Sequence, residues 1–457
     1  MRRPLNPFSL LCGILFLLAA PPDLFPAGPA EELPSQWTPQ SAVRFALANN
    51  PETAIIRERI AAARAAVMEA DSAFYPRLDL SASYSRTDNP MYSFGNILNQ
   101  GEFDESIDFN APGTTDNLNM AATASYRLYN GGSDQAGLRV AEASETASRH
   151  EMESVRARLA FEVIKTFFTI LQAEDTVQAR QSAVGAAAAL VSVAQARCRA
   201  GDLLQADLLN LEVHHAEEQE NLIQARHGLQ LARRAFLNLL GLEEGTVLVD
   251  RGSPVELQVP AAPDIALRPE LMAMEAAVQA AEARVRQEQG GYYPTADAFA
   301  GYQVDQGYEL DGSGNSWLAG VKVNFNLFSG RNTAARIAGA RAVLAEKKEQ
   351  LRKISLAIRL EVEQASLAVE QTEQRMEVTE KMVAQAQESA RLSRERFKEG
   401  VILSSELIDV ENRLTGAVVR RTAARTAHRI AVADFRRACG LPQFDQPSED
   451  PANPADS

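Results

Sequence analysis

The sequence of 457 residues is poor in cysteine, histidine and aromatic side chains, and acidic residues outnumber basic ones. It has three cysteines, five histidines, 6% aromatic residues and a formal net charge of −14. Beyond the N-terminal 30 residues only Cys198 and Cys439 remain, and two such thiols do not make a disulfide framework. Because nucleic acids attract basic surfaces, the negative charge argues against a nucleic-acid partner.

Motifs for catalysis and for cofactor binding are also missing. The chain has no glycine-rich phosphate loop and no Gly-x-Ser-x-Gly motif. Among the histidines only His214 and His215 are adjacent, and neighbours on a helix point about 100° apart, so they do not converge on one ion. We therefore expect no catalytic residues, no cofactor and no metal site, and a protein that is not an enzyme.

Long apolar runs are absent after residue 30, where no stretch reaches the roughly 18 apolar residues of a membrane-spanning helix. Any membrane crossing would therefore use β-strands. Residues 1–30 have the pattern of a secretory signal peptide, with Arg2 and Arg3 before an apolar run and small residues near Ala30. Cys12 follows the bulky Leu11, which argues against lipid modification.

The sequence does contain an ordered internal repeat. The paired segments are Pro51 with Pro269, Tyr75-Pro76 with Tyr293-Pro294, Leu128 to Gly131 with Leu327 to Gly330, Arg197 to Gly201 with Arg396 to Gly400, and Phe236 to Leu242 with Phe435 to Leu441. The first two pairs are 218 positions apart and the other three are 199 positions apart. The difference of 19 positions places one insertion in the first copy, around residues 89–116.

The repeat and the turn signals divide the chain into five parts. We expect a signal peptide at residues 1–30, a first repeat at 31–245, a linker rich in proline and valine at 246–263, a second repeat at 264–441, and a disordered acidic tail at 442–457.

Each repeat contains two segments in which apolar and polar residues alternate. They lie at about residues 77–85 and 118–128 in the first repeat, and at about 295–304 and 317–327 in the second. Near-strict alternation over about ten residues is typical of a transmembrane barrel strand. The alternative is a half-buried strand of a soluble sheet. Such a sheet needs an apolar layer over the same face, but the rest of the sequence is predicted to form long helices.

Long helices are expected at about residues 133–240 and 331–438, each interrupted by a turn at Gly201 or Gly400. No proline interrupts residues 133–199, and a helix of that length spans about 100 Å. Helices this long exceed a globular core and need partner helices, as in a coiled coil.

Four strands cannot close a barrel, and open sheet edges are not tolerated in lipid. Since the smallest closed membrane barrels have about eight strands, several chains must build the barrel. The predicted fold class is mainly α with a β-barrel part, in which antiparallel coiled-coil helices form an α-barrel and each chain contributes four transmembrane strands.

These ordered, duplicated motifs resemble the TolC-type outer-membrane efflux proteins over nearly the whole chain after the signal. The resemblance implies a homotrimer whose twelve strands form one barrel in outer-membrane lipid and whose helices form a tunnel across the periplasm. It implies a periplasmic adaptor protein and an inner-membrane transporter as partners, as in efflux and type I secretion. A soluble periplasmic coiled-coil scaffold without a pore is the alternative, and no residue selects among drugs, metals and secreted proteins as cargo.

The resemblance also implies a periplasmic constriction near the two helical turns. Glu406 and Asp409 lie six and nine positions after Gly400, and their counterparts in the first repeat are Asp207 and Asn210. Rings of carboxylates from several chains would favour cations. The alternative is an ordinary solvated helix face.

The turns themselves resemble the tips that meet the adaptor. The residues concerned are Arg197, Gly201, Asp202 and Leu203 in the first repeat, and Arg396, Gly400, Val401 and Ile402 in the second. Ordinary interhelical turns are the alternative. The sequence departs from the best-known family pattern here, because Phe397 has no hydroxyl and Ile402 is not basic, so we do not expect the family's closed-state latch in its usual form.

Overall fold

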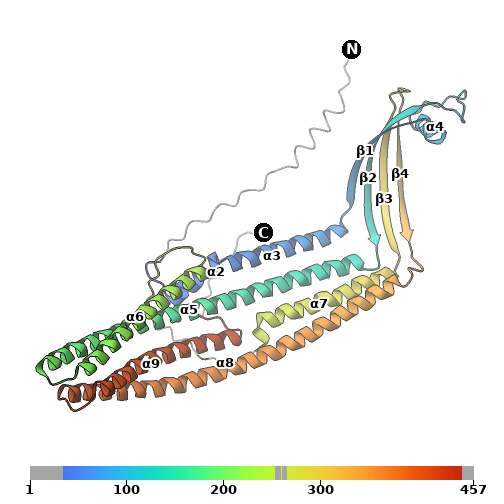
Figure 1. Ribbon diagram of the computed structural model, residues 1–457. Helices are drawn as coiled ribbons and strands as arrows, with labels where there is room; N and C mark the ends of the chain where they lie inside the picture. Colours follow the sequence, from blue (N-terminus) through green and yellow to red (C-terminus); the bar gives the residue numbers. More distant parts are fainter. Residues whose placement is uncertain (1–33, 253–258, 260–264, 445–457) are drawn as a thin grey trace.

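Two copies of one unit follow each other along the chain, each with a short helix, a β-hairpin and two long antiparallel helices (Figure 1). The structure is a computed structural model that describes residues 34–252, 259 and 265–444. The predicted signal peptide, residues 253–258 and 260–263 of the predicted linker, and residues 445–457 of the predicted tail lie outside the described residues.

The elements of each copy occur in the same order, apart from two extra helices in the first. The first copy consists of α2 (Pro39–Asn49), α3 (Pro51–Asp71), β1 (Arg77–Thr87), α4 (Pro90–Asn99), β2 (Thr115–Tyr129), α5 (Ser133–Ala200) and α6 (Gln205–Leu240). The second consists of α7 (Pro269–Gln289), β3 (Thr295–Gln306), β4 (Ser313–Asn324), α8 (Asn332–Lys398) and α9 (Ser404–Ala438). Short 3₁₀ turns, η1 (Ser72–Phe74), η2 (Ile265–Leu267) and η3 (Gly290–Tyr292), precede β1, α7 and β3.

Proline and asparagine set where the short helices begin. Proline occupies the first position of α2, α3, α4 and α7, where its missing N–H costs no helical hydrogen bond. The Asn50 side chain caps α3 by accepting from the Glu52 N–H at 2.7 Å. The long helices α5 and α8 have 68 and 67 residues without a proline, and each is therefore about 100 Å long.

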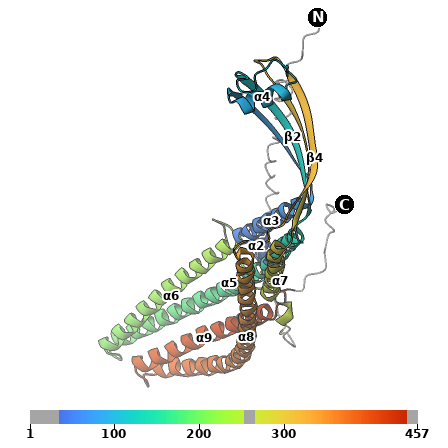
Figure 2. The same ribbon diagram turned by 90° about the vertical axis from the view of Figure 1, so that its right-hand side faces the viewer.

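The four strands form one antiparallel sheet in the order β1-β2-β3-β4, and the sheet curves strongly (Figure 2). The register of the two hairpins is the same once the repeat offsets are applied. Arg77 lies opposite Ser125 in the first hairpin, and Thr295 lies opposite Asn324 in the second. Within the described residues, the outer edges of β1 and β4 pair with no strand.

The apolar face of this sheet is uncovered. The sheet projects beyond the ends of the long helices, and none of these helices lies over it (Figures 1 and 2). Leu80 is 78% exposed and Trp317 is 77% exposed. In the described part of the chain, no helix is both long enough and apolar enough to span a membrane. The predicted fold class, long helices with four strands per chain, is confirmed.

The strand β4 begins and ends earlier than the sequence pattern predicted, at residues 313–324 instead of about 317–327. Its last residue, Asn324, lies opposite Thr295 of β3. The residue before Thr295 is Pro294, which has no N–H to donate, so the ladder stops there.

The helix α4 lies in the first outer loop, a segment that the sequence pattern predicted as polar loop. Asn89 caps it by accepting from the Met91 N–H at 3.1 Å. Phe94 of the helix forms a cluster with Phe103 and Phe109, which follow it, and the Phe94 and Phe109 ring centroids are 4.6 Å apart. The loop is therefore folded around its own aromatic residues.

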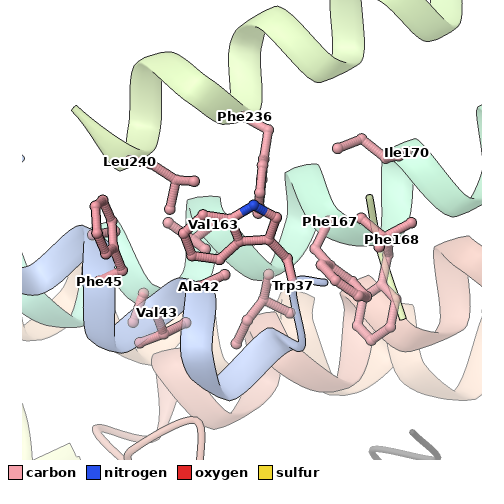
Figure 3. Packing of buried hydrophobic residues seen from close by; sticks show 14 of the residues in the cluster. Trp37, Ala42, Val43, Phe45, Val163, Phe167, Phe168, Ile170, Phe236 and Leu240 are labelled. Atoms are coloured by element: carbon pink, nitrogen blue, oxygen red, sulfur yellow. The ribbon is translucent and has the colours of Figure 1, made fainter. Parts of the chain in front are cut away.

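The largest apolar core surrounds Trp37, which is 2% exposed (Figure 3). Its ring meets Phe45 of α2 at 5.3 Å and Phe236 of α6 at 6.0 Å between centroids, both edge to face. The Trp37 backbone also bonds to the segment after α6, donating to the Leu248 carbonyl at 2.7 Å. This core fixes the end of α6 against the middle of α5, far from the sheet (Figure 1).

Candidate functional site: the tip of the long helices

The tip consists of two turns with the same backbone geometry, one joining α5 to α6 and one joining α8 to α9. Gly201 and Gly400 have φ values of 84° and 78°, a conformation that favours glycine. The Asp202 N–H donates to the Arg197 carbonyl and the Val401 N–H donates to the Arg396 carbonyl, both at 2.9 Å. The equivalent residues of the two turns are thus 199 positions apart, which is the offset of the sequence repeat in this region.

Arg197 joins the two turns. Its Nη1 donates to the Phe397 carbonyl at 2.6 Å, and its Nη2 donates to the Asp202 carbonyl at 3.1 Å. The guanidinium also lies over the Phe397 ring, 5.4 Å from the ring centroid. The charge-assisted hydrogen bond to the Phe397 carbonyl and the cation–π contact with the Phe397 ring both join Arg197 of the first repeat to the second repeat.

A second polar contact joins the repeats next to the turns. Ser404, at the start of α9, is 1% exposed and donates its hydroxyl to Asp207 Oδ1 at 2.6 Å. Of the four predicted constriction residues, Asp207 is therefore the one that the structure brings into contact with the other repeat.

An apolar cluster fills the space between these contacts. Its members are Leu190, Ala194, Leu208, Leu211, Phe397, Ile402 and Leu407. Phe397 is 1% exposed. This is the position at which the family pattern has a tyrosine, and here its ring lies in an apolar environment. Ile402, a predicted adaptor-contact residue, is also buried in this cluster.

The other predicted constriction residues lie on the surface of the tip. Asn210, Glu406 and Asp409 are exposed. Asp409 lies 3.8 Å from Arg413, but both side chains are more than 70% exposed, so the pair contributes little to stability. Among the described residues, the Glu406 side chain makes no ion pair or hydrogen bond.

Two exposed leucines mark the ends of the turns, and sequence reasoning did not single them out. Leu204 is 72% exposed and Leu403 is 67% exposed, and Val401 between the helices is 60% exposed. Leu204 and Leu403 occupy the N-cap positions of α6 and α9, where a serine or aspartate side chain would cap the helix. An apolar residue at a cap position was the signal that could have identified them.

Above the tip, each helix pair is joined by a buried carboxylate. Arg180 of α5 meets Glu218 of α6 at 3.3 Å. Arg394 of α8 donates through Nε and Nη2 to Glu411 of α9, at 2.5 and 2.7 Å. The hydrogen bonds with Glu411 raise the pKa of Arg394 above its ordinary value. The sequence did not predict these pairs, because each joins two residues on different helices that come together only when the turn between the helices folds the chain back.

No group of three or more His, Cys, Asp or Glu residues could hold a metal ion in the part of the chain that the structure describes. Cys198 and Cys439 are free thiols there. The features of the tip are the contacts between the two repeats, the exposed acidic residues, and the exposed apolar residues Leu204, Val401 and Leu403.

Comparisons with known proteins agree with this architecture. The family model described as "Outer membrane efflux protein" matches residues 42–242 and 265–441. The chain is 28% identical over 360 residues to "Protein CyaE" of Bordetella pertussis, covering 74% of this chain and 70% of that protein. It is 21% identical over 376 residues to "Outer membrane efflux protein BepC" of Brucella suis, covering 80% of this chain and 76% of that protein.

Solved structures share the fold. CusC, whose crystal structures were described for the changes accompanying folding and transmembrane channel formation, matches with a TM-score of 0.78 at 16% identity. The match covers 93% of this chain and 99% of that chain.

Proposed function

This chain belongs to the outer membrane efflux protein family, and from that premise we propose how copies of it build a channel and what the tip contributes. The protein is an outer-membrane duct for efflux, with its helical part in the periplasm. Its family and fold are those of channel proteins and not of enzymes. The soluble coiled-coil scaffold is not favoured, because the apolar face of its sheet would be left in water.

Three copies form one channel. The observation that carries this proposal is the open four-stranded sheet, whose edge strands β1 and β4 are unpaired and whose apolar face is exposed. In lipid each edge must pair with another strand, so β4 of one copy pairs with β1 of the next. Three chains supply twelve strands, which lies within the range of closed membrane barrels.

The tip is the docking surface for a periplasmic adaptor that connects the duct to an inner-membrane transporter. The exposed apolar side chains of Leu204, Val401 and Leu403 support this, because clustered apolar residues on a polar surface are typical of protein contacts. In the predicted adaptor-contact set, Gly201, Asp202 and Val401 lie on the surface. Arg197 is half-buried and bonds to the other repeat, and Ile402 is buried in the tip cluster.

Four polar residues of the tip form the periplasmic constriction. Asp207, Asn210, Glu406 and Asp409 lie within the first two turns of α6 and α9. Repeated around a ring of three chains, the carboxylates of Asp207, Glu406 and Asp409 produce a negative potential at the entrance that favours cations over anions, and Asn210 contributes a neutral amide.

Membrane fractionation and electrophoresis test this function. We expect the protein in the outer-membrane fraction, and an unheated sample that migrates as a trimer and becomes a monomer on heating. Purified protein should insert into planar lipid bilayers and conduct ions. A monomer in the periplasmic soluble fraction would instead support the scaffold and overturn the channel.

A further inference from the structure

A groove of about 690 Å³ lies where the helices meet the sheet, at the opposite end of the molecule from the tip. The first turns of α5 and α8 line it together with the end of α7 and η3, and these segments adjoin the ends of the strands (Figure 1). Gly131 of the groove follows the last residue of β2 by two positions, and Tyr293 precedes the first residue of β3 by two. We call it the junction groove. Its volume lies within the range of about 300–1,000 Å³ that is typical of ligand sites.

Three arginine side chains line the junction groove, one from each helix. They are Arg139 of α5, Arg286 of α7 and Arg341 of α8. In the part of the chain that the structure describes, none of these three guanidinium groups makes an ion pair or a hydrogen bond. The described residues that line the groove include no aspartate or glutamate. The groove therefore carries positive charge that the chain itself does not neutralise.

The fold of the repeat does not require these arginines. The positions equivalent to Arg139, Arg286 and Arg341 in the other repeat are occupied by Ala338, Met68 and Glu142. Other arginines at the same end of the helices do have a structural partner, because Arg284 and Arg336 both pair with Glu288, at 2.9 and 2.7 Å. The three groove arginines are thus left for a ligand from outside the chain.

The junction groove lies on the side of the helices that faces away from the channel lumen. Arg127, on the polar face of β2, pairs with Asp297 of β3 and with Asp134 of α5. In the channel proposed above, on which this step rests, the polar face of the sheet lines the lumen, so Asp134 marks the lumenal side of α5. Arg139 lies five residues later, about 140° around the helix axis from Asp134. Its side chain is therefore on the side that meets lipid and periplasm.

The arginines also lie at the level of the lipid headgroups. Arg139 and Arg341 are about 9 and 14 Å along the axis from the first residues of α5 and α8. Side chains on a helix lean toward its N-terminus, which for both helices is the membrane end. Tyr292 and Tyr293 are each 56% exposed at the same junction, as is typical of residues at a membrane interface.

We infer that the junction groove binds the phosphate of an anionic phospholipid in the periplasmic leaflet of the outer membrane. Guanidinium groups present paired donors that match two phosphate oxygens at a time. The N-terminal ends of α5 and α8 add positive potential at the same place. Gln135 and Gln289 also line the groove, and their amides can donate to headgroup hydroxyls. Basic pockets beside membrane-spanning segments are typical headgroup sites. With one groove in each chain, a trimer binds three such lipids.

Native mass spectrometry of the detergent-solubilised trimer tests this site by counting retained lipids. We expect up to three phosphatidylglycerol molecules per trimer, and far fewer of phosphatidylcholine with the same acyl chains, since choline offsets the phosphate charge. Arg139→Gln with Arg286→Gln and Arg341→Gln should weaken phosphatidylglycerol binding at least about tenfold, because charge-assisted contacts are lost. Equal retention of the two lipids by the wild type, or unchanged affinity in this variant, would overturn the inference.

A matched variant removes the same charge elsewhere. Arg57→Gln with Arg59→Gln and Arg359→Gln changes three exposed arginines of α3 and α8 that do not line the groove. This variant should retain phosphatidylglycerol as the wild type does. Equal loss of binding in both triple variants would attribute the effect to net charge and contradict a specific groove.

Inorganic phosphate distinguishes a lipid headgroup from a free anion. Phosphatidylglycerol should raise the temperature at which the wild-type trimer dissociates by about 2–4 °C, and it should have little effect on the groove variant. Inorganic phosphate at the same concentration should leave the wild-type temperature unchanged. A shift with phosphate as large as that with the lipid would identify a free-anion site and overturn the lipid assignment.

Assembly is checked before lipid binding. A wild-type protein recovered as a soluble monomer would overturn the proposed channel and this site with it, whereas trimers that do not prefer phosphatidylglycerol overturn the site alone. If the triple groove variant does not assemble, the three single Arg→Gln variants replace it. Unchanged phosphatidylglycerol affinity in all three would again contradict the inference.

Discussion

At the scale of single residues, the tip depends on polar side chains whose partners lie far away in the sequence. Arg197 and the Phe397 carbonyl are 200 positions apart, and Ser404 and Asp207 are 197 apart. Each of these contacts joins one repeat to the other. Among the described residues, the exposed carboxylates Glu406 and Asp409 make no such contact with the other repeat, so both face solvent, where they can act on ions.

Removing the charge of these two carboxylates should weaken cation selectivity. We expect Glu406→Gln with Asp409→Asn to lower the cation-to-anion permeability ratio at least about twofold, because the negative potential at the constriction falls. Reversal potentials in planar bilayers under a salt gradient measure this ratio. The control is Glu388→Gln with Glu395→Gln, two exposed carboxylates of α8 that are paired with nearby basic residues. An unchanged ratio in the first variant would contradict a constriction at these residues.

The sequence identified part of this site and could not identify the rest. Gly201 and Gly400 were recognisable because a left-handed turn favours glycine. The carboxylates were assigned to a constriction only through the family resemblance, and that assignment stays a prediction. The Arg197 contact was not recognisable, since its acceptor is a backbone carbonyl that leaves no mark in the sequence. The burial of Ile402 was hidden for a related reason, because the apolar cluster takes members from both repeats.

At the scale of elements, the periodic segments were predictable and the irregular one was not. The strands follow from alternation with period two, and α5 and α8 follow from long stretches without proline. The helix α4 is different, because its Phe94 packs on Phe103 and Phe109, which lie outside the helix. No local periodicity reports such a contact.

The ends of the helix pairs should be sensitive to charge if they bind an adaptor. We expect Leu204→Asp with Leu403→Asp to abolish crosslinking to a periplasmic adaptor in cells, because charged side chains would be buried at an apolar contact. The trimer should persist, since both leucines are exposed. Leu231→Asp, at an exposed position of α6 outside the turns, is the control and should leave crosslinking intact. Crosslinking that survives in the tip variant would rule out these leucines as adaptor contacts.

At the scale of the whole molecule, a buried arginine joins the start of the second repeat to the helices around it. Arg268 is 4% exposed and contacts Glu270, Glu361 and the Ala438 carbonyl, each at 2.9 Å. Glu270 in turn accepts from the Ser154 hydroxyl of α5 at 2.9 Å. The two repeats are therefore tied together through one carboxylate as well as through the apolar cores.

This carboxylate should make stability depend on acid pH. Burial raises the pKa of Glu270, but the hydrogen bonds and charge of Arg268 outweigh it and hold this pKa below its ordinary value of 4.5. A lowered folded-state pKa stabilises the fold fully above the ordinary value, and this contribution is lost as pH falls through the folded value. Heat dissociation of the trimer should thus shift to lower temperature below about pH 4.5.

Glu270→Gln tests the origin of that shift. We expect the variant to dissociate about 2–4 °C lower than the wild type at neutral pH and to show a smaller decrease on acidification. Glu58→Gln, an exposed position of α3, should keep the wild-type pH profile. Parallel profiles for wild type and Glu270→Gln would assign the acid sensitivity to other groups.

The Trp37 core lies at the end of the α5–α6 pair that is farthest from the tip, and this position sets the distance between a pivot there and the tip. The α5–α6 pair extends from this core to the tip over the 36 residues of α6, a length of about 54 Å. Over that length, a rotation of about 5° at the core displaces the tip by about 5 Å without breaking any helical hydrogen bond. A pivot at this core would therefore act as a lever arm the length of α6, so that a small angular change where Trp37 packs is enough to displace the tip by several ångströms.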